Sequence, residues 1–156
     1  MKRFLPALLL GLTLVSCNLD AAVFVDPSIT SPTLTVQKVA LGTTLSGGFN
    51  LELHLSARAS GPSNVTVGSF SLRTSDQQTV LAPNLPVTTH PASPIGVAEN
   101  STQTVEVAID TMSATLDASA HDAICAGQVV VTGTITDSLE TSPTSVTSAP
   151  FTPQCP

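Results

Sequence analysis

Between residues 49 and 58, apolar and polar side chains alternate without a break. The apolar members of this run are Phe49, Leu51, Leu53, Leu55 and Ala57, and a polar residue follows each of them. Because successive side chains of a β-strand point to opposite faces of the sheet, this order places every apolar side chain on one face. The run therefore predicts a β-strand with one buried face and one face in water.

Six further segments carry a similar pattern of alternating, β-branched residues. They span residues 34–41, 65–73, 77–81, 102–110, 128–136 and 144–151. Connectors with turn-forming residues separate them, at residues 46–48, 60–64, 82–94 and 137–143. Within the 65–73 segment the apolar phase shifts by one residue at Gly68 and Ser69, which predicts a β-bulge. Seven short strands with such connectors predict an all-β fold, a two-sheet antiparallel sandwich.

This architecture resembles immunoglobulin and fibronectin domains. The chain has no Trp and no Tyr, so the buried Trp of antibody domains and the Tyr of their tyrosine corner are both missing. The resemblance therefore concerns the architecture alone and implies an immunoglobulin-like sandwich of about seven strands. We place this domain at residues 34–156.

One segment departs from the two-residue period. Met112, Leu116 and Ala120 recur at a spacing of four residues, as the apolar face of a helix does. Asp110 or Thr111 is a suitable amino-terminal cap for such a helix. A short helix and an irregular loop fit residues 111–124 equally well.

The amino-terminal residues have the features of a bacterial export signal. Two basic residues precede an apolar stretch at residues 4–15, which is too short for a bilayer-spanning helix of about 20 residues. The stretch ends in Leu14-Val15-Ser16-Cys17, which resembles the lipobox of bacterial lipoproteins. The resemblance implies that residues 1–16 are removed as a signal peptide and that the Cys17 thiol is lipidated.

Lipidation of Cys17 implies an anchored domain. Each buried CH₂ contributes about 0.8 kcal/mol, so two or three acyl chains make membrane attachment effectively permanent. The expected location is therefore the cell membrane or the outer membrane, with the domain outside the cytoplasm. Residues 17–33 contain Pro27 and Pro32 and show no sustained period, so we expect a flexible tether. The alternative is that residues 21–25 dock as an edge strand, which Pro27 ends.

The remaining two cysteines predict a disulfide. With Cys17 lipidated, Cys125 is left to pair with Cys155, and an exported compartment permits the bond. If the turn at residues 137–143 centres on Glu140, the two cysteines face each other across the open end of a hairpin. We expect the bond to hold the last strand in place and to stabilise the fold by about 3 to 4 kcal/mol.

The sequence predicts neither an enzyme nor a cofactor. Motifs of serine hydrolases, zinc proteases and phosphate-binding loops are absent. A hydrolase would still be possible from distant residues, with a His in hydrogen-bond reach of a Ser or an acid. His121, Asp122 and Cys125 form an H-D-x-x-C sequence. With Cys125 oxidised, only two ligands remain where zinc uses three or four, so we expect no metal site.

Charge and composition favour an interaction module. The net charge is −6 with five Lys and Arg residues, whereas nucleic-acid affinity depends on many basic side chains, so we expect no nucleic-acid partner. We expect a non-catalytic interaction or structural module that binds an unidentified envelope protein through a loop or an edge strand. The candidate contact is the Pro-rich loop at residues 82–94, with Asn84, Leu85, Pro86 and His90. The alternative is a small-ligand-binding lipoprotein, which predicts a cavity of at least about 300 Å³.

Overall fold

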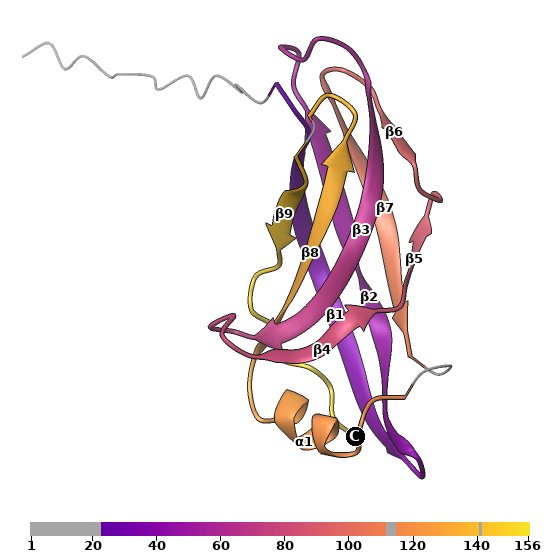
Figure 1. Cartoon of the computed structure of the whole chain (residues 1–156), viewed down its shortest axis with the longest axis vertical. Helices are drawn as coiled ribbons and strands as arrows, with labels where there is room; N and C mark the ends of the chain where they lie inside the picture. Colours follow the sequence, from indigo (N-terminus) through magenta and orange to yellow (C-terminus); the bar gives the residue numbers. More distant parts are fainter. Residues whose placement is uncertain (1–22, 112–114, 141) are drawn as a thin grey trace, which may run out of the picture.

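Two antiparallel sheets packed face to face make up the protein (Figure 1). The computed structural model describes residues 23–111, 115–140 and 142–156. One sheet has the order β1-β2-β7-β5 and consists of β1 (Asp26–Val39), β2 (Gly42–Leu55), β7 (Ser101–Asp110) and β5 (Val87–His90). The other has the order β4-β3-β8-β9 and consists of β4 (Val80–Leu85), β3 (Ser63–Thr74), β8 (Val129–Asp137) and β9 (Thr144–Thr147), with β6 (Ile95–Val97) also paired to β3.

This strand order confirms the predicted sandwich. The first sheet corresponds to strands A, B, E and D of an immunoglobulin constant domain, and β3, β8 and β9 correspond to C, F and G. Strand β4 adds an outer strand beside β3. The described residues thus form nine strands, where about seven were predicted.

The core follows the alternation in the sequence. Phe49, Leu51, Leu53 and Leu55 of β2 are all buried, as predicted. The Phe49 ring meets Phe70 of β3 across the two sheets, with ring centroids 5.1 Å apart. Gly133 of β8 leaves room for the Phe70 ring, because a Cβ at this position would lie 2.2 Å from a ring carbon.

Both sheets contain an irregular position, and the sequence predicted one of them correctly and the other wrongly. The pairing of β3 with β8 shifts between Val67 and Phe70, which confirms the bulge at Gly68 and Ser69. The turn predicted at residues 46–48 is wrong, because β2 runs straight through it. Gly47 has φ +152°, and a Cβ there would lie 2.2 Å from the Thr33 carbonyl oxygen. This glycine serves the close approach of β1 rather than a turn.

The prediction of a flexible tether at residues 17–33 is wrong for the second half of that range. Residues 26–33 belong to β1, so the domain begins earlier than residue 34. Ile29 is buried and pairs with Leu51, which holds this part of β1 on the sheet. Pro27 and Pro32 are tolerated because β1 is an edge strand with a register shift between Thr30 and Thr33. Residues 17–22 lie outside the described residues.

The loop predicted at residues 82–94 is also wrong. The chain forms β4, passes Pro86, and continues as β5 in the opposite sheet. The strand predicted at residues 77–81 is therefore displaced to Val80–Leu85. Ala82 and Leu85 are buried in the core, which keeps this proline-containing segment against the sandwich.

Residues 111–124, which depart from the two-residue period, form an irregular segment followed by a short helix in their described part. Helix α1 (Ser119–Cys125) is short, and its Ile124 is fully buried. The helix starts after Leu116, because that residue exchanges two backbone hydrogen bonds of 2.9 Å with Thr43. Thr111 does not cap the helix, since its hydroxyl accepts a 2.6 Å hydrogen bond from the Leu45 N–H. Met112 lies outside the described residues.

Candidate functional site at the pole opposite the amino terminus

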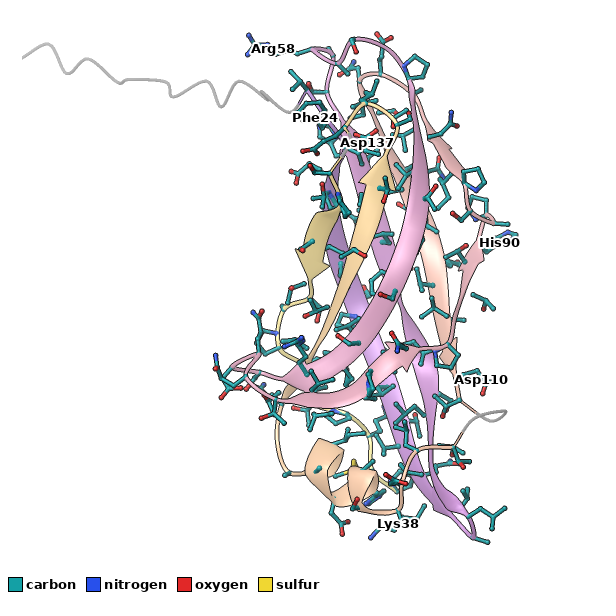
Figure 2. All side chains as sticks on the ribbon, viewed as in Figure 1. Phe24, Lys38, Arg58, His90, Asp110 and Asp137 are labelled. Atoms are coloured by element: carbon teal, nitrogen blue, oxygen red, sulfur yellow. A yellow bond between two sulfur atoms is a disulfide. The ribbon has the colours of Figure 1, made fainter. Side chains whose placement is uncertain are left out.

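The described chain starts at one end of the long axis, and β1 runs from there toward the other end (Figure 1). Asp137 and Phe24 mark the first end, and Lys38 marks the second (Figure 2). We call these ends the amino-terminal pole and the distal pole. The distal pole holds the β1–β2 hairpin, α1 and the carboxyl terminus.

A buried carboxylate organises the amino-terminal pole. Asp137 is 2% exposed. Its carboxylate accepts hydrogen bonds from the Val25 N–H at 2.7 Å, from the Leu139 N–H at 2.9 Å and from the Ser63 hydroxyl. Because a buried carboxylate is stable only with hydrogen-bond donors around it, these bonds connect the start of β1 firmly to the second sheet. The chain therefore leaves the domain at a fixed point.

Apolar side chains are exposed at both poles: Val23 and Phe24, at the amino-terminal pole, are 44% and 41% exposed, and the most exposed apolar side chain lies at the distal pole. Leu41, at the tip of the β1–β2 hairpin, is 89% exposed, and its neighbour Val39 is 41% exposed. Val80, at the start of β4, is 43% exposed. Gly42 closes the hairpin with φ +149°, and a Cβ there would lie 2.2 Å from the Leu116 carbonyl oxygen. The hairpin tip is therefore held against the segment that leads into α1.

Two neighbouring hollows lie between these exposed side chains. The larger, of about 580 Å³, lies between β4 and the segment from Thr115 to α1. Its apolar lining consists of Val80, Leu81, Pro83, Leu116, Ala120 and Ala123. The smaller, of about 350 Å³, lies beside the hairpin tip and shares Thr115 with the first. Of the described residues that line the two hollows, Asp117 alone is charged, so this surface suits an uncharged, apolar contact.

The edge strands offer poorer contact sites than the distal pole. Among the described residues, proline lies in or beside each of the five outer strands: Pro27 and Pro32 in β1, Pro83 in β4, Pro86 and Pro91 around β5, Pro94 before β6, and Pro143 before β9. Proline cannot donate a backbone hydrogen bond, so it interrupts the ladder that an added strand needs. The middle of β1 is also occupied, because Gln154 exchanges 2.8 Å backbone hydrogen bonds with Leu34 and Val36. Strand addition is thus hindered at every edge.

The predicted disulfide is present at the distal pole. Cys125, the last residue of α1, is bonded to Cys155, with a Cα–Cα distance of 6.2 Å. The turn between β8 and β9 spans the residues between Asp137 and Thr144, as expected. The carboxyl-terminal tail is held independently as well, through the Gln154 bonds and a pair of backbone hydrogen bonds between Phe151 and Val129.

A histidine lies next to this disulfide. The Nε2 atom of His121 lies 3.8 Å from the Cys125 Sγ, and its Nδ1 lies 2.9 Å from the Asp122 carboxylate. Lys38 Nζ lies 2.8 Å from the same carboxylate oxygen. The hydrogen bond from Lys38, followed by that from His121, lowers the pKa of Asp122 below its ordinary value of 3.8. The contact that a hydrolase requires between a His and an acid is present, but the other nitrogen of this ring faces a sulfur atom in a disulfide.

The structure does not assemble the residues of the predicted interaction loop into one exposed surface. Leu85 is buried, while Asn84 and His90 lie along the side of the sandwich in β4 and β5. His90 projects from that side, far from the hairpin tip (Figure 2). Cys17 lies outside the described residues. One feature of the sequence marks the distal tip: three apolar residues, Val39, Ala40 and Leu41, follow one another directly before Gly42. In a half-buried strand, apolar and polar residues would alternate instead.

A scan against models of protein families finds no match, and a search of curated proteins finds none either. Among the described residues, no helix has the length and apolar character needed to cross a bilayer.

Proposed function

We propose that this chain is a lipid-anchored, non-catalytic interaction module of the bacterial cell envelope. Cys17 carries the anchor, and the distal pole binds another envelope protein. The observation that supports this most is the separation of the two ends: the chain enters the domain at one pole, and the exposed Leu41 and Val39 lie at the opposite one (Figure 1).

The short connection to the membrane supports this orientation. Val25 is fixed to Asp137, so the eight residues after Cys17 set the reach of the anchor. A fully extended chain of this length spans about 28 Å. The amino-terminal pole therefore stays close to the bilayer, and the distal pole points away from it.

The chemistry of the distal pole indicates the kind of partner. Its hairpin tip exposes the aliphatic side chains of Leu41 and Val39, and the nearby cation of Lys38 is already paired with Asp122. A partner that presents an apolar segment with few charges complements this surface. Affinity in such a contact comes from buried apolar area, at about 25 cal/mol per Å² before the costs of association.

A small-ligand-binding lipoprotein is the second candidate. The 580 Å³ hollow at β4 and α1 favours it, because ligand sites commonly measure about 300 to 1,000 Å³. The hollow lies at the surface rather than between the sheets, where the side chains of both sheets form a continuous core. We therefore rank this function below protein binding.

The anchor is tested on the chain purified from membranes of its native cell. Mass spectrometry is expected to find an amino terminus at Cys17 with a mass increase from acyl chains. The Cys17→Ser variant is expected to move from the detergent phase to the buffer. A native product that retains residues 1–16 would contradict the anchor.

The contact surface is tested by photo-crosslinking in intact cells. A photoreactive amino acid placed at position 41 is expected to give a discrete crosslinked product. The matched control carries the same group at position 90, on the side of the sandwich. A product from position 90 and none from position 41 would assign binding to the β4–β5 segment instead.

A further inference from the structure

Three potential metal ligands converge at the distal pole. His121 Nε2, Cys125 Sγ and Cys155 Sγ all lie within 4.8 Å of one another. They come from separate parts of the chain, because His121 and Cys125 are one helical turn apart in α1 and Cys155 belongs to the carboxyl-terminal tail. In the oxidised protein the two sulfur atoms are bonded to each other and are not available to a metal.

Asp122 orients the imidazole toward the sulfur atoms. Its carboxylate can only accept a hydrogen bond, so the Nδ1 atom of His121, 2.9 Å away, is assigned as the protonated donor. In the neutral ring, Nε2 then carries the lone pair, and this is the atom that lies 3.8 Å from the Cys125 Sγ. Metal-binding histidines typically have such a carboxylate on their second nitrogen.

The backbone segments that carry the three side chains are held by contacts other than the disulfide. The tail is held by the backbone hydrogen bonds of Gln154 to β1 and of Phe151 to Val129. Helix α1 is held by the buried Ile124 and by the pairing of Leu116 with Thr43. Reduction of the bond therefore leaves both thiols beside His121.

We propose that reduction of the Cys125–Cys155 disulfide creates a zinc site with His121 Nε2, Cys125 Sγ and Cys155 Sγ as its protein ligands. A dithiol reductant supplies two electrons and two protons: its own sulfurs become a disulfide, and the bond between Cys125 and Cys155 is replaced by two thiols. Zn²⁺ then binds both sulfurs as thiolates, and two protons are released to solvent. A water molecule completes the four ligands.

The distances fit a tetrahedral zinc ion. With Zn–S near 2.3 Å and Zn–N near 2.0 Å, neighbouring ligand atoms are separated by about 3.5 Å for nitrogen and sulfur and about 3.8 Å for two sulfurs. The observed separation of His121 Nε2 and Cys125 Sγ is already 3.8 Å. Cys155 lies in an exposed tail, so its side chain is free to turn to the required separation. Thiolate and imidazole ligands favour zinc over calcium or magnesium.

The test compares zinc binding to the oxidised and the reduced full-length chain in detergent. The protein is reduced with a phosphine, desalted without oxygen, and titrated with Zn²⁺ by calorimetry. We expect one zinc ion per reduced chain and none per oxidised chain. With Co²⁺ in place of zinc, the reduced chain is expected to show the absorption of a cobalt–thiolate complex.

Variants separate this site from other thiols. We expect Cys155→Ser and His121→Gln each to abolish stoichiometric binding, and Asp122→Asn to weaken it about 10-fold to 100-fold. Unchanged affinity in His121→Gln would overturn the site, because the thiols alone would then account for binding. Equal binding to the oxidised chain, or loss of the β-sheet circular dichroism on reduction, would overturn it as well.

Discussion

The two poles of this sandwich are held together by opposite means. At the amino-terminal pole, one buried carboxylate accepts three hydrogen bonds, and the stabilising group is polar. At the distal pole, a disulfide, a short helix and a backbone-paired tail hold the structure, while large apolar side chains remain exposed. The comparison teaches that the amino-terminal pole is fixed by a buried polar group and the distal pole by a covalent bond and backbone hydrogen bonds. Exposed apolar side chains occur at both poles, and the most exposed of them, Leu41, is at the distal one.

Removal of the disulfide is expected to have the largest effect on stability. The Cys125→Ser and Cys155→Ser double variant frees a loop of 30 residues, which corresponds to about 3 to 4 kcal/mol in the chain-entropy model. Chemical denaturation followed by circular dichroism measures the change. A loss well below 1 kcal/mol would mean that the tail hydrogen bonds alone hold this pole.

Removal of the buried carboxylate is the matching experiment at the other pole. Asp137→Ala leaves the Val25 N–H and the Ser63 hydroxyl without their acceptor, so we expect a loss of about 2 to 3 kcal/mol. The exposed acid Glu99, at the same pole, provides the control as Glu99→Gln. Similar unfolding midpoints for both variants would show that the carboxylate does not fix the start of β1.

The hairpin at the distal pole is tested with a glycine pair. Gly42→Ala introduces a Cβ at φ +149° and against the Leu116 carbonyl, so a loss of about 1 to 3 kcal/mol is expected. Gly127→Ala, just beyond α1, adds a Cβ that meets no atom within 4 Å and is expected to be neutral. Denaturant midpoints of the two variants give the comparison. Equal midpoints would contradict the close contact between hairpin and helix segment.

Exposed apolar residues at the distal pole are expected to matter for binding and not for folding. Leu41→Ser changes a side chain that is 89% exposed, so the unfolding free energy is expected to stay within about 0.5 kcal/mol. Photo-crosslinking from position 39 is expected to fall strongly in the same variant. An undiminished yield would separate the hairpin tip from the contact surface.

The smallest effect concerns the exposed carboxylate of the distal pole. Lys38→Ala removes the main cause of the lowered pKa of Asp122, so that pKa is expected to rise toward 3.8 in an NMR titration. A carboxyl group whose pKa is lowered in the native state stabilises the fold at pH values above its ordinary pKa. This stabilisation is lost as the pH falls through the lowered pKa. Because Asp122 is exposed, acid unfolding is expected to change little. An unchanged pKa would mean that Lys38 is not its partner in solution.

The sequence predicted those parts of the fold that depend on residues close together in the chain. The alternation in β2 and the bulge at Gly68 could be predicted from spacing along the chain. The cysteine pairing was predicted because the lipobox resemblance assigns Cys17 to lipidation and leaves two cysteines. The strand at residues 26–33 could not, because its prolines suggested a tether and only its place at the edge of a sheet makes them acceptable. The same reason explains β4 and β5, where prolines mark the change of sheet.

The candidate site was less predictable because it depends on contacts distant in sequence. Thr43 and Leu116, which pair beside the hairpin tip, are 73 residues apart, so nothing near either residue indicates their hydrogen bonds. The H-D-x-x-C sequence drew attention to His121, Asp122 and Cys125, but we expected no metal site there because Cys125 was expected to be oxidised. The direction of the imidazole toward the disulfide became visible only with Cys155 in place.

The prolines of the outer strands gain importance if the chain is anchored as proposed. Molecules confined to a bilayer diffuse in two dimensions and meet their own copies frequently, with sandwiches of similar height side by side. An uninterrupted edge would allow such neighbours to join into a growing sheet. With a proline in or beside every outer strand, the copies can crowd together on the membrane and still separate.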